Sequence, residues 1–140
     1  MADERAVGSQ MADILWASAQ KEGVPPDMTR DKFLGSIGQL IKQGAFLLPY
    51  GKTVLMVKPL QQGTAELHTF TTEDGKAVVQ AYIAGAKFAK KNGIKHVVSY
   101  ADSPAFVKYA KQTGLPVKVS QTARMQGGQM QPMYQFDLDL

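Results

Sequence analysis

A carboxylate and an imidazole stand two positions apart in the segment from Ala65 to Phe70, which partly alternates between apolar and polar residues. Glu66 and His68 would therefore project from one face of a strand. Because histidine titrates near neutral pH, the pair could exchange protons with a bound molecule. Two polar residues on one strand face are also typical of the exposed side of an edge strand, and the sequence leaves both interpretations open.

The stretch from Thr71 to Ala77 follows this strand and leads into a long segment with an apolar stripe. Thr72 is expected to cap a helix there. Glu73 and Asp74 then fall in the first turn, where carboxylates interact favourably with the positive end of the helix dipole. On this interpretation the two acids need no role beyond starting the helix.

The residue types argue against cysteine chemistry and against metal binding. The chain has no cysteine, which excludes disulfides, thiolate metal sites and cysteine nucleophiles. His96 lies among apolar neighbours and is predicted to be a core histidine. The two histidines do not pair at i, i+4 with a carboxylate, so no metal site is expected.

The charge pattern argues against a nucleic-acid groove. The net charge is +4 with a pI near 9.3, and the densest cluster is Lys87, Lys90, Lys91 and Lys95. This cluster is typical of a solvated helix face and end. Specific nucleic-acid binding is not expected, because a longer basic stripe with interleaved aromatic residues is missing. No apolar run reaches the roughly 18 residues of a membrane span, and the polar start is not a signal peptide.

Periodicity and turn residues divide the chain into an α/β pattern. A single domain is expected over residues 1–140, with an N-terminal helix pair in 1–44 and a sheet with two helices in 45–140. The second strand is apolar at successive positions and should be central. The expected helices are 9–21, 30–43, 73–92 and 104–113, and the expected strands of a mixed sheet are 46–48, 53–58, 64–70, 94–100, 115–120 and 133–139.

Two further expectations concern packing. The segment from Met125 to Met133, rich in Gln, Met and Gly, is predicted to be a mobile hairpin tip. Its methionines would either offer adaptable partner contacts or fold back on the core. The residues expected to be largely buried are Val54, Met56, Leu67, Val79, Ile83, Val97, Phe106 and Phe136.

The order of elements resembles the GNAT superfamily of N-acetyltransferases. The most similar stretch is AKFAKKNGIKHVVSYADSPAFVKYAKQTGLPV, residues 86–117. The resemblance covers roughly residues 46–140, and the N-terminal helix pair would stand for the family's first two helices. The family's first strand has no good counterpart. The resemblance implies a GNAT-like mixed sheet flanked by helices.

The family's cofactor loop has the form Arg/Gln-x-x-Gly-x-Gly/Ala and binds the coenzyme A pyrophosphate through backbone amides. The corresponding stretch here, Thr71–Ala77, has one glycine, no arginine and two carboxylates. The resemblance leaves Thr72, Gly75, Lys76 and Ala77 as candidate cofactor-binding residues.

The family's catalytic groups have counterparts as well. The resemblance suggests Glu66 or His68 as general base. Tyr109, on the predicted short helix, is either the general acid or a core aromatic residue. No metal ligand is implied.

The degenerate loop favours a non-catalytic structural or interaction protein. The chain also resembles GNAT-like internal virion proteins of T7-like tailed phages, which implies an internal or head–tail component of a phage particle. The expected partners are then other proteins, virion proteins or further copies of the chain, without a cofactor, in the cytoplasm of a bacterial host or packaged in the particle. The alternative is an active N-acetyltransferase that uses acetyl-CoA through an atypical loop.

Overall fold

The computed structural model describes residues 8–126 and 128–140, so the predicted polar start, residues 1–7, lies outside the described residues. Six strands form one mixed sheet in the order β1-β2-β3-β4-β6-β5. The predicted order of helices and strands is confirmed. The elements are α2 (Ser9–Glu22), α3 (Arg30–Lys42), β1 (Phe46–Tyr50), β2 (Thr53–Pro59), β3 (Thr64–Thr71), α4 (Gly75–Lys91), β4 (His96–Ala101), α5 (Ala105–Gln112), β5 (Lys118–Gln126) and β6 (Gln129–Asp139).

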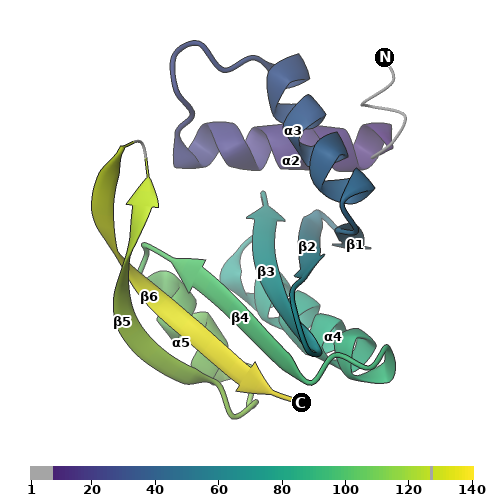
Figure 1. Cartoon of the computed structure of the whole chain (residues 1–140), viewed down its shortest axis with the longest axis vertical. Helices are drawn as coiled ribbons and strands as arrows, with labels where there is room; N and C mark the ends of the chain where they lie inside the picture. The colour runs from purple at the N-terminus through teal and green to yellow at the C-terminus, as the bar shows by residue number, and fades with distance from the viewer. Residues whose placement is uncertain (1–7, 127) are drawn as a thin grey trace.

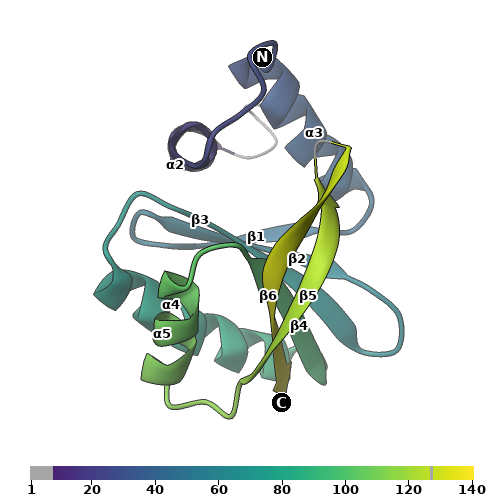
Figure 2. The same cartoon turned by 90° about the vertical axis from the view of Figure 1, so that its left-hand side faces the viewer.

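Helices cover both faces of the sheet. Figure 2 shows α2 and α3 on one side and α4 with α5 on the other. Val54 and Met56 of β2 face the first pair and are buried in a cluster with residues of α2 and α3. Leu55 faces α4 and is fully buried. The strand β2 is therefore covered on both faces, as its continuous apolar run predicts.

The start of α4 differs from the prediction. The cap is Asp74, whose carboxylate accepts a hydrogen bond from the Ala77 N–H at 3.3 Å. Thr72 instead donates its N–H to the Lys52 carbonyl at 3.4 Å. The turn after β1 thus holds Thr72 just beyond the end of β3, and Asp74, the next suitable residue, caps the helix instead.

The strands β3 and β4 separate partway along their length. Their parallel pairing runs from Thr64 opposite His96 to Leu67 opposite Ser99. Beyond that pair β3 continues to Thr71 and β4 to Ala101. Figure 1 shows the two strand ends pointing apart. The sheet is therefore forked at the carboxyl ends of its two parallel strands.

The strand β6 lies in two different environments. It pairs with β4 only from Tyr134 to Asp139, but with β5 all the way to Gln129. Its first part therefore forms a two-stranded ribbon with β5 that projects beyond β4 (Figure 1). The segment predicted to be a hairpin tip is mostly this ribbon, with Met125 opposite Met130.

Half of the predicted core is confirmed and half is not. Val54, Met56, Val79 and Phe136 are buried. The other four, Leu67, Ile83, Val97 and Phe106, are only half-buried. Three of these, all except Ile83, line a cavity.

The prediction of a core histidine at position 96 is wrong. The ring of His96 is hydrogen-bonded to Asp139 through Nδ1 at 2.7 Å and to Asp137 through Nε2 at 3.0 Å. Its side chain keeps 31% of its surface exposed. Val97 points to the other sheet face, because strand residues alternate, whereas Val98 shares the face of His96 and is buried.

Candidate functional site at the fork between β3 and β4

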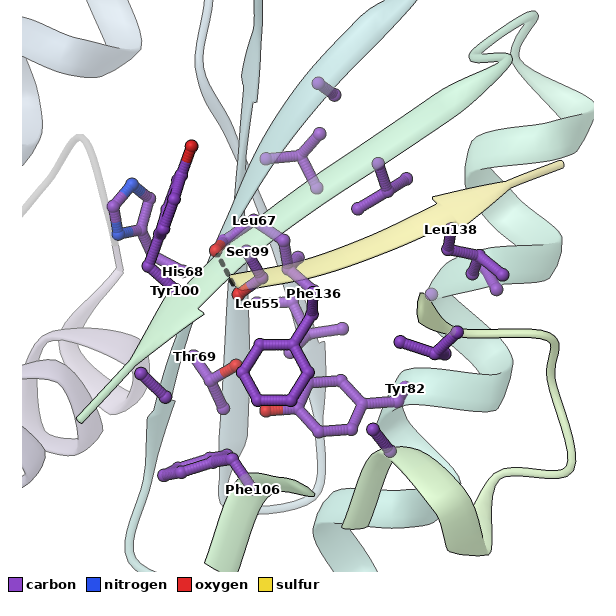
Figure 3. A pocket seen from close by; sticks show the side chains of 18 of the residues that line it. Leu55, Leu67, His68, Thr69, Tyr82, Ser99, Tyr100, Phe106, Phe136 and Leu138 are labelled. Atoms are coloured by element: carbon purple, nitrogen blue, oxygen red, sulfur yellow. Dashed lines mark hydrogen bonds between the residues drawn. The ribbon is translucent and has the colours of Figure 1, made fainter. Parts of the chain in front are cut away.

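A cavity of 290 Å³ lies where β3 and β4 separate. Its walls come from β2, β3, β4 and β6 on one side and from α4 and α5 on the other. Figure 3 shows Phe106, Phe136 and Leu138 among the side chains that line it. Most of the wall is apolar, which suits a largely uncharged ligand.

The cavity passes through the sheet. Leu67, Thr69 and Ser99 share the face that carries α4, because Thr69 contacts Tyr82 of that helix and Ser99 lies opposite Leu67. His68 and Tyr100 alternate with them and point to the opposite face (Figure 3). All five line the same cavity. The fork therefore connects the two faces of the sheet.

The sheet face toward α2 carries a hydrogen-bonded pair of a carboxylate and an imidazole. His68 Nε2 lies 2.5 Å from Glu66 Oε2, and the Glu66 side chain is 13% exposed. With the carboxylate accepting the Nε2–H, the lone pair of the imidazole is on Nδ1. The predicted sharing of one strand face is confirmed. The edge-strand interpretation is wrong, since β3 lies inside the sheet.

Arg124 of the β5–β6 ribbon reaches over this face. Its guanidinium carbon lies 4.0 Å from the centre of the Tyr100 ring, a cation–π contact. One guanidinium nitrogen lies 3.9 Å from Glu66 Oε1. The ribbon thus brings a cation close to the carboxylate that holds His68.

The opposite side of the fork holds a partly buried pair of hydroxyl groups. Thr69 Oγ1 and the Tyr82 hydroxyl share a hydrogen bond of 2.7 Å. Burial raises the pKa of Tyr82 to about 12, although its bond to Thr69 opposes the shift. Tyr82 therefore keeps its proton at neutral pH. Against a thiolate, whose conjugate acid has a pKa of about 8.5, it is a hydrogen-bond donor rather than an acid.

Two carboxylates also line the cavity, Glu22 from the end of α2 and Asp102 just beyond β4. Loss of hydration raises the pKa of Glu22, and the negative charge of Asp102 raises it further. No lysine or arginine is found among the described residues that line the cavity. Both carboxylates belong to exposed residues, so they make the mouth of the cavity favour neutral or cationic groups over anions.

The predicted cofactor loop lies at the start of α4 and is occupied by groups of the chain itself. Asp74 takes the Ala77 N–H, and a Glu73 carboxylate oxygen accepts the N–H of Lys52. A Cβ built on Gly75 would lie 2.2 Å from a ring carbon of Tyr109. These residues do not fit a diphosphate, because negative charge and an aromatic ring stand where an anion would approach the helix.

The candidates from the sequence are thus divided between two places. Of the pair Glu66 and His68, only His68 is among the residues that line the cavity. Tyr109 does not line it and packs on Gly75 instead. Sequence reasoning assigned no functional role to Arg124 or Tyr82. The phenol of Tyr82 was a usable signal, since a buried tyrosine hydroxyl normally needs a partner.

The described part of the chain holds no group of three or more His, Cys, Asp or Glu residues that could bind a metal ion. None of its helices combines the length and the apolar character required to cross a membrane.

Comparison with known proteins supports the fold. No protein-family model and no curated protein matches the sequence. Solved structures do match. An acetyltransferase from Bacillus subtilis in complex with CoA is 14% identical, with a TM-score of 0.62 over 95% of this chain and 93% of that one. A probable GNAT-family acetyltransferase from Chromobacterium violaceum is 15% identical, with a TM-score of 0.68 over 94% and 77%.

A spermidine N-acetyltransferase from Vibrio cholerae is 7% identical, with a TM-score of 0.68 over 91% of this chain and 89% of that one. The architecture is therefore the GNAT fold, as the resemblance implies. At these identities the likeness concerns the fold alone. The expected kinship with phage virion proteins finds no support among these neighbours, which are all acetyltransferases.

Proposed function

We propose that the protein is a GNAT-fold acyltransferase that moves an acyl group from a thioester to an amine. The observation that carries the proposal is the Glu66–His68 pair beside a cavity that passes through the forked sheet. The cavity can hold a thioester on the side of α4 while an amine approaches from the side of α2. Acetyltransferase neighbours, one of them in complex with CoA, support this function.

The chemistry needs one proton acceptor. The amine nitrogen attacks the thioester carbonyl carbon, the carbon–sulfur bond breaks, and an amide and a thiolate form. The proton lost by the amine passes to His68 Nδ1, while Glu66 holds Nε2–H and stabilises the imidazolium. The thiolate takes its proton from water, since Tyr82 is too weak an acid.

The acceptor should be an amine whose attacking nitrogen enters as the free base and which carries further cationic groups elsewhere in the molecule. Glu22 and Asp102 bring negative charge to the cavity wall, and no lysine or arginine is present among the described lining residues. The neighbour that acetylates spermidine makes this polyamine a sensible first acceptor to test.

The test is release of thiol from an acetyl thioester in the presence of spermidine. His68→Gln and Glu66→Gln should each lower kcat by roughly 10²–10⁴-fold, the usual contribution of general acid–base catalysis. His96→Gln is the matched control, because this histidine is also bonded to carboxylates but does not line the cavity. Equal rates in all four proteins would contradict the assignment.

A second candidate function is a non-catalytic interaction protein, with a phage virion component as its most specific form. The observation that favours it is the start of α4, where Asp74 and the Tyr109 ring stand in the way of a diphosphate. The exposed Met125 and Met130 on the ribbon would then offer the contact surface. Absence of any thioester binding, together with a stable complex with another protein, would support it.

A further inference from the structure

The start of α4 decides which donors the site can accept. In an α/β sheet, ligands bind in the crevice beyond the carboxyl ends of the parallel strands. Phosphate groups bind there to the amides at the start of the following helix. In the β3–α4–β4 unit that place is formed by Glu73, Asp74 and Gly75.

Fixed negative charge occupies this place. The Asp74 carboxylate is bonded to the Ala77 N–H, so it sits on an amide that an anion would need. Glu73 is held beside it by the N–H of Lys52. Two carboxylates within a few ångströms of an incoming diphosphate would repel it.

An aromatic ring blocks close approach as well. The Tyr109 ring lies so near Gly75 that an added Cβ would be 2.2 Å from its Cε1 and 2.8 Å from its Cζ. Glycine at such a position normally lets a phosphate approach the backbone. Here the ring of Tyr109 takes up that space, and α5 is packed on the start of α4 through it.

The cavity itself suits a small uncharged arm. Its 290 Å³ is at the lower limit of the roughly 300–1,000 Å³ found for drug-sized ligands. The described lining residues include the carboxylates of Glu22 and Asp102 and no lysine or arginine. An aliphatic amide chain that ends in a thioester fits this interior, whereas a diphosphate would meet no cation there.

We propose that the donor is an acyl thioester on a pantetheine-like arm, and that its adenosine diphosphate portion, where one is present, makes no favourable contact. Asp74, Gly75 and Tyr109 are the residues that determine this specificity. The inference rests on the proposed acyltransferase function and names the donor class for it.

The direct test is calorimetric titration of the full chain with pantetheine and with CoA, which share one arm and differ in the nucleotide. We expect CoA to bind no tighter than pantetheine. A tenfold or larger preference for CoA would overturn the inference. A rise in CoA affinity with ionic strength would support it, because salt screens the repulsion by Glu73 and Asp74.

Substitutions at Tyr109 and Asp74 test whether these residues set the ratio of CoA affinity to pantetheine affinity. Tyr109→Ala combined with Asp74→Asn removes the ring and one charge but keeps a helix cap. The affinity for CoA relative to pantetheine should then rise at least tenfold. Tyr109→Phe keeps the ring over Gly75 and should keep the wild-type ratio. An unchanged ratio in the double variant, with the fold confirmed by circular dichroism, would contradict the inference.

The outcomes separate the two proposals. If acetyl-CoA and acetyl-pantetheine both donate but CoA binds at least tenfold tighter, only the donor inference fails. If neither thioester binds or reacts, the acyltransferase function fails and the inference with it. A third donor, acetyl pantetheine attached to an acyl carrier protein, distinguishes a free small thioester from a carrier-bound one, and a preference for either supports the inference.

Discussion

The Ser99 hydroxyl donates a hydrogen bond of 2.9 Å to the carbonyl oxygen of Leu67, at the last paired position before β3 and β4 separate (Figure 3). The carbonyl lies where the ladder ends, so this side chain replaces the next backbone partner. The fork is thus closed at its base by a hydroxyl rather than by another strand hydrogen bond.

Replacing this hydroxyl should loosen the base of the fork. Ser99→Ala removes the partner of the Leu67 carbonyl and should lower the free energy of unfolding by about 1 kcal/mol. Urea denaturation followed by circular dichroism measures the change. The control is Ser36→Ala, whose hydroxyl donates to the Lys32 carbonyl on an exposed turn of α3. If Ser99→Ala loses no more unfolding free energy than Ser36→Ala, water satisfies the Leu67 carbonyl as well as the serine hydroxyl does.

Gly75 should be intolerant of alanine for one identifiable reason. The new Cβ would clash with Tyr109, and overpacking of this kind costs typically about 1–3 kcal/mol. In a Tyr109→Ala background the same change should be neutral or stabilising by up to ~1 kcal/mol, since alanine is the better helix former. A double-mutant cycle by denaturant unfolding measures the coupling. Independent effects of the two changes would mean that the ring does not rest on Gly75.

The pH dependence of stability should contain a contribution from His96. Hydrogen bonds to Asp139 and then Asp137 raise the pKa of His96, and the bond to His96 lowers the pKa of Asp139. The His96 contribution is therefore fully present below its unfolded pKa of about 6.5. It is lost as the pH rises through the folded pKa. The Asp139 contribution is present above its ordinary pKa and is lost as the pH falls through the lowered value.

Unfolding free energies of the wild type and His96→Gln, compared between pH 5 and pH 9, test this. The difference between the two proteins should shrink at pH 9. Because the histidine is about one-third exposed, solvent screening limits its contribution to under about 1 kcal/mol. A difference that grows with pH would reverse the assigned sign.

Oxidation should distinguish the methionines of the ribbon from those of the core. Met125 and Met130 are 64% and 60% exposed, whereas Met133 is 8% exposed. Dilute hydrogen peroxide should convert the first two to sulfoxides well before the third. Peptide mass spectrometry follows each site separately. Early oxidation of Met133 would mean that this part of β6 opens far more often than its burial indicates.

Local sequence signals predicted the existence and order of the elements, because apolar periodicity and capping residues act over a few positions. The last two strands were predicted too short, as 115–120 and 133–139, whereas β5 runs to Gln126 and β6 begins at Gln129. The apolar run of β2 predicted its burial on both faces, and alternation placed Glu66 beside His68. The start of α4 was missed by two residues, because Thr72 and Asp74 are both good caps and the hydrogen bond to Lys52 decided between them.

The site itself depends on distant contacts that no local pattern encodes. Leu67, Val97 and Phe106 have the types and spacing of core residues, and only the divergence of β3 from β4 turns them into a cavity wall. Arg124 reaches Tyr100 because the ribbon leans over the sheet. His96 is not a core residue, because its ring is hydrogen-bonded to Asp137 and Asp139. Both lie on the last strand, far from His96 in the sequence.

The unequal pairing of β6 gives the molecule a gradient of local stability along a single strand. From Tyr134 to Asp137 each residue is held between two neighbouring strands, so its amide can exchange with solvent only when a large part of the sheet opens. From Gln129 to Met133 the strand has one neighbour, and a two-stranded ribbon is only marginally stable by itself. Arg124 belongs to that ribbon, so fraying of its end would repeatedly withdraw the guanidinium from Tyr100 and Glu66 and return it, without disturbing the rest of the fold.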